Sequence, residues 1–299
     1  MSYILKTFSF LFFTLFMLAV NATHNRAGEI TFRHISGLTY EASFVIYSDP
    51  ASPASTRTEI EVCWGDEGEC NQNTLTRLNT RTETQLSPKV QRNEWKARHT
   101  YNGSGSFKIT LTDPARNAGI SNISNSVSVP LYLETTLRIS PFQNVVNNSP
   151  ILLNFPIDEG CQDRLFLHNP GAVDPDGDSL AYEIDKSRTT GGVPADGYVF
   201  PPASTAIYVD PITGDLIWDN PSHLGSFNVA IRIKEYRNGV LIGSVMRDLQ
   251  IDIEFCSNRP PQILTEAEHC VTANELLVFD VEAFDPDQSS TENKVTLTS

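Results

Sequence analysis

Three aspartates at alternate positions offer the clearest chemistry in this chain of 299 residues. Asp174, Asp176 and Asp178 stand in a Pro/Gly-containing segment, and Asp285 and Asp287 repeat the beginning of that pattern. Hard cations such as calcium take about six to eight oxygen ligands, which closely spaced carboxylates can supply. The interpretation that we favour is a tight turn in which the aspartate side chains accept hydrogen bonds from backbone amides. The alternative is a calcium site, and the sequence indicates no other cofactor.

The same segment contains Gly177-Asp178-Ser179-Leu180, which spells the signature of one class of serine hydrolases. That chemistry needs a serine between a strand and a helix, together with a histidine three residues after an aspartate. None of the six histidines follows an aspartate at that spacing, and the residues after Ser179 alternate as in a strand. We therefore predict no catalytic residues and no enzymatic activity.

Five cysteines bear on the redox compartment. In an exported chain, cysteines without metal-ligand spacing favour disulfides. Cys63 and Cys70 flank one polar turn, and Cys161 and Cys256 bracket the second half of the chain, so we predict these two pairs. A Cys256–Cys270 pair remains an alternative. If Cys256 pairs with Cys161, we expect the partner of Cys270 to lie beyond residue 299.

The aromatic residues divide into two groups by their surroundings. Trp64 and Trp218 occupy strand motifs and are expected to be core anchors, while His99 is expected to hydrogen-bond within the turn region near Trp64. Trp95 stands among charged and polar neighbours (Arg92, Asn93, Glu94 and Lys96). Aromatic faces stack on sugar rings, so Trp95 is predicted to be an exposed glycan platform.

The N-terminus predicts export. Lys6 precedes an apolar run over residues 8–20, and the small residues up to Ala22 form a cleavage site. The run is shorter than the roughly 20 residues of a spanning helix, so residues 1–22 are predicted to be a signal peptide and no membrane insertion is expected. The chain has 36 acidic and 22 basic residues, a net charge of −14. That acidity disfavours nucleic acid and anionic membranes as partners.

Alternation of apolar and polar residues dominates the rest of the chain. It is clearest over residues 38–46, 107–111, 227–233 and 249–255, with Gly, Pro, Asn and Asp between them. This period of two is typical of half-buried strands, and many short strands predict an all-β fold of tandem β-sandwiches.

Composition divides the chain into a signal peptide and three modules. The expected sandwiches span residues 23–134 and 135–257, and residues 258–299 begin a third sandwich that is incomplete in this sequence. The pair Pro260-Pro261 is expected to act as a stiff linker, because proline restricts the backbone.

The first module resembles the PKD family. Trp64-Gly65-Asp66 with Gly68, followed by His99 and Tyr101 and by the alternating strand at residues 105–111, matches that family's motifs over roughly residues 37–133. Two departures are an extra residue before Gly68 and a longer separation between the two halves of the motif. The resemblance implies an immunoglobulin-like β-sandwich.

The second module resembles the cadherin-like family of the dystroglycan type. Its marks are an Asp-x-Asp-Gly-Asp-x-Leu-x-Tyr run ending at Tyr182, the run Gly214-x-Leu216-x-Trp218, and the strand beginning at Gly225. The order of modules is similar to exported, gliding-motility-associated surface proteins of Bacteroidota.

These observations predict a non-catalytic segment of a secreted or cell-surface, adhesin-like protein. Its expected partners are surface proteins or glycans, which the sandwiches would bind. The alternative is an accessory carbohydrate-binding region of a secreted hydrolase, with a catalytic domain beyond residue 299. A sorting domain or a hydrolase domain further along the reading frame would distinguish the two.

Overall fold

The computed structural model describes residues 25–257, apart from 67, 69, 71–73, 115 and 141–145, together with 262–264, 270–272, 274–279 and 281–284. The predicted signal peptide, the Pro260-Pro261 linker and the aspartates Asp285 and Asp287 lie outside the described residues. The chain forms two compact units, Met1–Glu254 and Phe255–Ser299. The smaller unit contains the short hairpin of β20 (Gln262–Leu264) and β21 (Glu282–Phe284).

The described residues confirm the predicted all-β class. Apart from strands, they form only three single-turn 3-10 helices, at Pro53–Thr56, Ser126–Ser128 and Thr190–Gly192. Within the described part of the chain, no helix is long and apolar enough to cross a membrane.

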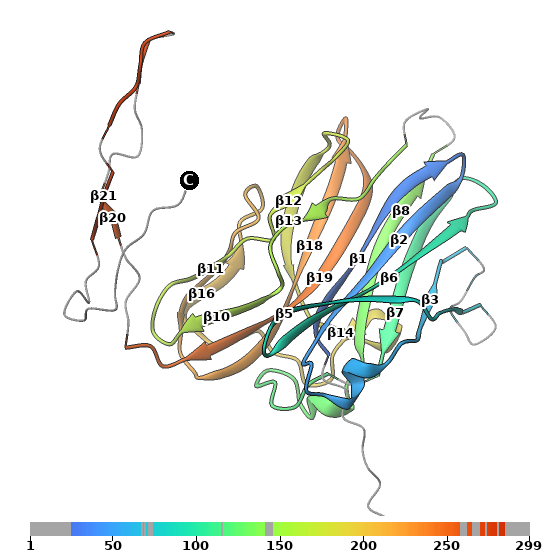
Figure 1. The fold of residues 1–299 in the computed structure, drawn as a ribbon, viewed down its shortest axis with the longest axis horizontal. Coiled ribbons are helices and arrows are strands. Elements are labelled where there is room, and N and C mark those ends of the chain that lie inside the picture. The colour runs from blue at the N-terminus through green and yellow to red at the C-terminus, as the bar shows by residue number, and fades with distance from the viewer. Residues whose placement is uncertain are drawn as a thin grey trace, which may run out of the picture. The chain divides into compact units, whose positions relative to one another are not determined.

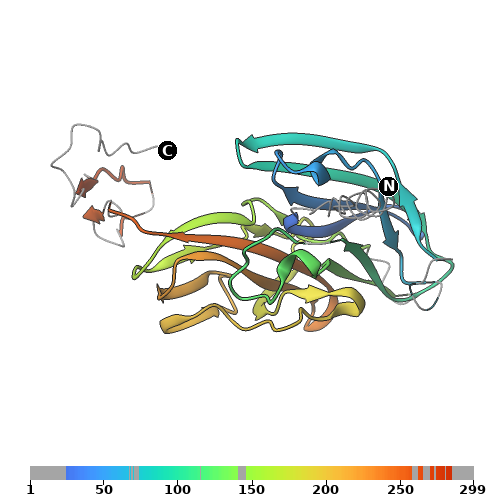
Figure 2. The ribbon, with the colours of Figure 1, turned by 90° about the horizontal axis from the view of Figure 1, so that it is seen from below.

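The first sandwich comprises eight strands around one core. Strands β1, β2, β6 and β5 form one layer, which Figure 2 shows in blue to teal along one side of the unit, and β4, β3, β7 and β8 form the other. The core lies between them because alternate residues of each strand point inward, as Phe44 and Leu133 do. The strands are β1 (Asn25–Ser36), β2 (Thr39–Ser48), β3 (Ile60–Cys63), β4 (Thr76–Leu78), β5 (Arg81–Ser87), β6 (Val90–Thr100), β7 (Gly105–Asp113) and β8 (Leu131–Ile139).

The second sandwich has its own core. One layer contains β10, β19, β18 and β13, and the other contains β11, β17 and β16. Trp218 of β17 and Phe227 of β18 meet edge to face between the layers, with ring centroids 5.2 Å apart. The strands are β9 (Ile151–Leu152), β10 (Ile157–Cys161), β11 (Phe166–His168), β12 (Ala172–Val173), β13 (Ser179–Asp185), β14 (Arg188–Thr189), β15 (Val193–Pro194), β16 (Ala203–Val209), β17 (Leu216–Pro221), β18 (Gly225–Arg237) and β19 (Val240–Glu254).

Strand β19 joins the two sandwiches. It pairs along its length with β18 in the second sandwich, and it also pairs with β8 at residues 243–245 and with β1 at Arg247 and Asp248. Figure 1 shows β19 lying between β18 and β1. The boundary expected between residues 134 and 135 therefore falls inside one compact unit, because a strand of the second half completes a sheet with strands of the first.

Buried ion pairs cross this seam. Arg116 donates to both carboxylate oxygens of Asp248, at 2.8 and 2.9 Å, and both side chains are fully buried. Arg247 donates to both oxygens of Glu29 at 3.1 and 3.2 Å. Removing one partner of such a pair leaves an uncompensated charge in the interior. The charges therefore favour one docking geometry of the two sandwiches.

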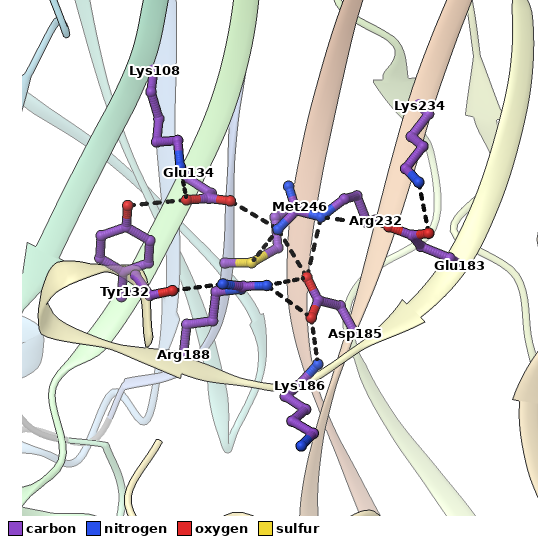
Figure 3. Close-up of polar contacts among 11 residues, drawn as sticks. Lys108, Tyr132, Glu134, Glu183, Asp185, Lys186, Arg188, Arg232, Lys234 and Met246 are labelled. Atoms are coloured by element: carbon purple, nitrogen blue, oxygen red, sulfur yellow. Dashed lines mark hydrogen bonds and ion pairs between the residues drawn. The ribbon is translucent and has the colours of Figure 1, made fainter. Parts of the chain in front are cut away.

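A second charged network also crosses the seam (Figure 3). Arg232 of β18 donates to Glu134 of β8 and to Asp185 of β13, both at 2.8 Å. Burial alone would raise the pKa of Asp185, but the hydrogen bonds from Arg232 lower it below its usual range. Arg188 adds two further bonds to Asp185. The network links a strand of the first sandwich to two strands of the second.

The structure corrects the interpretation of Trp95. This residue is 2% exposed and lies in the core of the first sandwich, where its indole nitrogen donates to the carbonyl of Thr58 at 2.7 Å. It cannot serve as an exposed glycan platform. The charged and polar neighbours that suggested exposure belong to strand β6, which is paired on both sides, with β2 and with β5. Glu94 and Lys96 point away from the face that Trp95 occupies, as alternation in a strand requires.

The other aromatic predictions are confirmed. Trp64 is 4% exposed and Trp218 is fully buried. His99 stacks on Trp64 with ring centroids 4.8 Å apart, and its Nε2 lies 2.7 Å from a carboxylate oxygen of Asp66. The two parts of the first motif, 33 residues apart, thus meet in one cluster.

Candidate functional site

The aspartates considered as cation ligands lie in the connection between β12 and β13, which we call the acidic turn (residues 174–178). One carboxylate oxygen of Asp174 accepts hydrogen bonds from the backbone amides of Asp176 and Asp178, both at 2.9 Å. Gly177 has a φ of +79°, a conformation that favours glycine. The local sequence therefore folds as a side-chain-supported turn, and the contacts expected of the plain-turn interpretation are present.

The turn also gathers its carboxylates on one side. One ligand oxygen from each of Asp174, Asp176 and Asp178 lies within 4.8 Å of the others. The second oxygen of Asp174 is buried and has no hydrogen-bond partner among the described residues. Burial raises the pKa of Asp174, and the charges of the neighbouring aspartates add to that effect.

Sequence reasoning missed the basic residue at this site. Arg237, at the end of β18, donates from Nε and Nη2 to the two oxygens of Asp178, at 2.7 and 2.5 Å. Its Nη2 also lies 3.5 Å from a carboxylate oxygen of Asp176. These carboxylates, Asp178 foremost, raise the pKa of Arg237. The sequence holds no local signal for this pairing, because the partners are 59 residues apart and meet only through the pairing of β13 with β18.

A buried carboxyl group adjoins the turn. Glu235 is 0% exposed, and burial, assisted by the charges of the three aspartates, raises its pKa to about 8. One of its oxygens accepts a hydrogen bond from the side-chain amide of Asn147 at 2.6 Å, and the other has no partner among the described residues. Glu235 continues the inward-facing alternation of Ile231 and Ile233 in β18. It therefore lies at the end of the core of the second sandwich, a position where the pattern predicts an apolar residue.

Two asparagines connect the acidic turn to the first sandwich. Asn148 donates to both oxygens of Asp176 from its backbone and side-chain amides, at 2.7 and 2.8 Å. The side-chain oxygen of Asn148 in turn accepts a bond from the amide of His34 in β1. Asn147 contacts both Glu235 and Arg237. The acidic turn is therefore linked, through Asn148, to strand β1 of the first sandwich.

The predicted disulfide Cys63–Cys70 is present, and Cys161 and Cys256 are disulfide-bonded as well. Cys161 ends β10, which runs parallel to β19 with Cys161 opposite Glu254. Cys270 is free and exposed, so the alternative pair Cys256–Cys270 does not form. Two disulfides are typical of proteins in an oxidising environment.

Comparison with known proteins found no match: no family model, no curated protein and no solved structure is similar to this chain.

Proposed function

We propose that this protein is an exported, non-catalytic, adhesin-like scaffold that presents its two β-sandwiches to a protein partner. An apolar row on the solvent side of the second sandwich carries the proposal. Leu167 of β11, Ile217 of β17 and Tyr208 of β16 lie directly opposite one another across three strands. Leu167 is 58% exposed and Tyr208 is 46% exposed, although a sheet covered on one face usually presents polar residues on the other.

The charge distribution supports a protein partner whose contact surface is surrounded by basic residues. Residues 141–257 contain sixteen acidic and seven basic residues, whereas residues 25–140 contain twelve of each. The acidity therefore belongs to the second sandwich. Exposed apolar patches with polar surroundings mark interaction sites. Like charges would oppose the pairing of two second sandwiches, and opposite charges would attract a cationic partner.

Four further features support the compartment and the scaffold role. The disulfides and the predicted signal peptide fit export. The strand β19 and the buried ion pairs would hold the two sandwiches in one orientation, which suits presentation of a surface.

The chemistry on the surface supports a non-catalytic role. Ser222 and His223, a serine–histidine pair at 2.8 Å, are adjacent in sequence, and no carboxylate contacts this histidine among the described residues. Because the three tryptophans are buried, the carbohydrate-binding alternative loses the platform on which it depended.

The experiment measures binding of the full chain to a panel of immobilised cationic proteins, acidic proteins and glycans. We expect binding to cationic proteins. Leu167→Asp and Tyr208→Asp should each weaken that binding about tenfold. Leu241→Asp is the matched control, because Leu241 is 45% exposed at the start of β19, away from the row.

Equal binding by the wild type and both row variants would contradict the proposal. So would binding confined to glycans, or no binding to any member of the panel.

A further inference from the structure

We propose that a groove at the fork between β8 and β19 binds the C-terminal end of an extended peptide through its terminal carboxylate. The groove lies on strands other than those of the apolar row in the second sandwich, so this proposal does not depend on the proposed function.

Strands β8 and β19 diverge after a short stretch of pairing. The pairing covers residues 135–137 of β8 and 243–245 of β19. Strand β8 continues to Ile139, still paired with β7, and β19 begins at Val240, already paired with β18. Beyond the shared stretch, each strand is therefore paired on one side only among the described residues. An open strand edge accepts an extended segment, whose backbone forms the missing hydrogen bonds.

A groove occupies this fork. Its volume is about 690 Å³, within the range of roughly 300–1,000 Å³ that is usual for ligand sites. Among the described residues, no aromatic side chain lines it. Aromatic faces are the surfaces on which sugar rings stack, so the lining favours a peptide over a glycan. The polar part of the lining includes Arg138 and the hydroxyl groups of Ser106, Thr136 and Ser244.

These four polar side chains lie together at the closed end of the fork. Thr136 and Arg138 are two residues apart in β8, so they point to the same face of the sheet. Ser106 of β7 lies opposite Arg138, and Ser244 of β19 lies opposite Thr136. Residues directly opposite one another in paired strands also share a face. The closed end therefore presents a guanidinium group and three hydroxyl groups, all of which can donate hydrogen bonds to a carboxylate.

Arg138 supplies the positive charge that a carboxylate would meet. Its side chain is exposed, and its Nη1 donates to the carbonyl of Leu241 across the fork at 3.2 Å. No carboxylate pairs with Arg138 among the described residues, although the chain as a whole has a net charge of −14. A guanidinium group with free donors binds a carboxylate through two parallel hydrogen bonds.

Two lysines add to the positive potential beside the groove. Lys108 of β7 and Lys234 of β18 lie on either side of β8 and β19 (Figure 3). Each is already paired with a glutamate, Lys108 with Glu134 at 3.3 Å and Lys234 with Glu183 at 2.7 Å. The charge available to a ligand at the closed end is therefore that of Arg138.

The shape of the fork selects the end of a peptide chain. An inserted strand can advance only to the point where β8 and β19 meet, at Leu137 and Gly243. Leu137 is the neighbour of Arg138, so the last residue of the inserted strand lies beside the guanidinium group. A terminal ammonium group would be repelled there, whereas a terminal carboxylate would be attracted.

The test measures binding of short acetylated peptides to the full chain by titration calorimetry. The probe is acetyl-Thr-Val-Thr-Val-Thr-Val with a free C-terminus, because β-branched residues favour an extended backbone. One comparison peptide has the same sequence with an amidated C-terminus. A second is amidated and ends in glutamate, so that its carboxylate belongs to a side chain. A third keeps the free C-terminus but is N-methylated at alternate residues, which removes backbone donors.

Two protein variants complete the design. Arg138→Gln removes the guanidinium group at an exposed position, so we expect its unfolding temperature to equal that of the wild type. Arg98→Gln is the matched control, because Arg98 is an exposed arginine of β6, in the other layer of the first sandwich. Both variants lose one positive charge, and only Arg138→Gln changes the groove.

We expect the wild type and Arg98→Gln to bind the free-acid peptide, and the three comparison peptides to bind about tenfold more weakly. Arg138→Gln should bind the free-acid and amidated peptides equally weakly. The proposal would be overturned if the wild type did not bind the free-acid peptide, or if any comparison peptide bound as tightly as that probe. Unchanged binding of the probe by Arg138→Gln would overturn it as well.

Discussion

Replacing Arg116 by methionine tests whether the buried ion pairs hold the two sandwiches together. Arg116 and Asp248 are both fully buried, and Arg116 also donates to the carbonyl of Arg188 at 3.1 Å. The Arg116→Met variant keeps most of the side-chain volume but leaves Asp248 with one remaining side-chain donor, Asn228, at 2.9 Å. An uncompensated buried charge of this kind costs about 3–5 kcal/mol. For a unit of this size, that loss corresponds to a fall of roughly 6–20 °C in unfolding temperature.

The assay is urea unfolding followed by tryptophan fluorescence, together with calorimetry. Trp64 and Trp95 report on the core of the first sandwich and Trp218 on that of the second. We expect one cooperative transition in the wild type. In Arg116→Met we expect a lower midpoint and separation into two transitions, because the seam is weakened while both cores are intact.

Two further variants make the reasoning refutable. Adding Asp248→Asn to Arg116→Met removes the unpaired charge and should recover about 2 kcal/mol or more of the lost stability, since the two sites are directly coupled. Arg77→Met breaks an exposed pair with Glu61 and should leave the midpoint unchanged. A loss below about 1 kcal/mol in Arg116→Met, or no recovery in the double variant, would show that the pair does not hold the seam.

Three other predictions follow from the packing. Trp95→Ala should destabilise the protein by about 3–5 kcal/mol in urea unfolding, as expected for a buried aromatic residue. Tyr208→Ala, at an exposed residue, should have little effect. Similar small losses in both variants would contradict the burial of Trp95. Limited proteolysis should yield a stable fragment that ends shortly after Glu254, where the larger unit ends, and degradation of that fragment would argue against an independent unit. Arg232 holds the pKa of Asp185 below its usual value of about 3.8, although burial alone would raise it. The ionised Asp185 therefore stabilises the folded state at pH values above about 3.8, and this stabilisation is lost as the pH falls through the lower, folded-state pKa. Melting from neutral to acidic pH should therefore show Asp185→Asn less stable than the wild type at pH 7, with the difference shrinking below about pH 4; a difference independent of pH would be the contrary result.

Local patterns were sufficient for several features. Alternation predicted the all-β class, and the spacing of Cys63 and Cys70 across one turn predicted their disulfide, which is present. The burial of Trp64 and Trp218 followed from their places in strand motifs. The local pattern was ambiguous at Trp95, because a paired inner strand and a polar loop can carry the same mixture of charged and aromatic residues.

The sequence by itself determined the strands, the turns and the acidic segment, because these depend on residues within a few positions of one another. Only the tertiary structure decided which groups share the site and the seam. Arg237 reaches the acidic turn through pairing of strands about 60 residues apart, and β19 joins β1 from more than 200 residues away. A strand's own sequence sets its inward and outward faces, but its neighbours are chosen by the packing of the whole unit. The buried charges at that junction are satisfied only in the assembled fold, so they cannot be recognised before it is known.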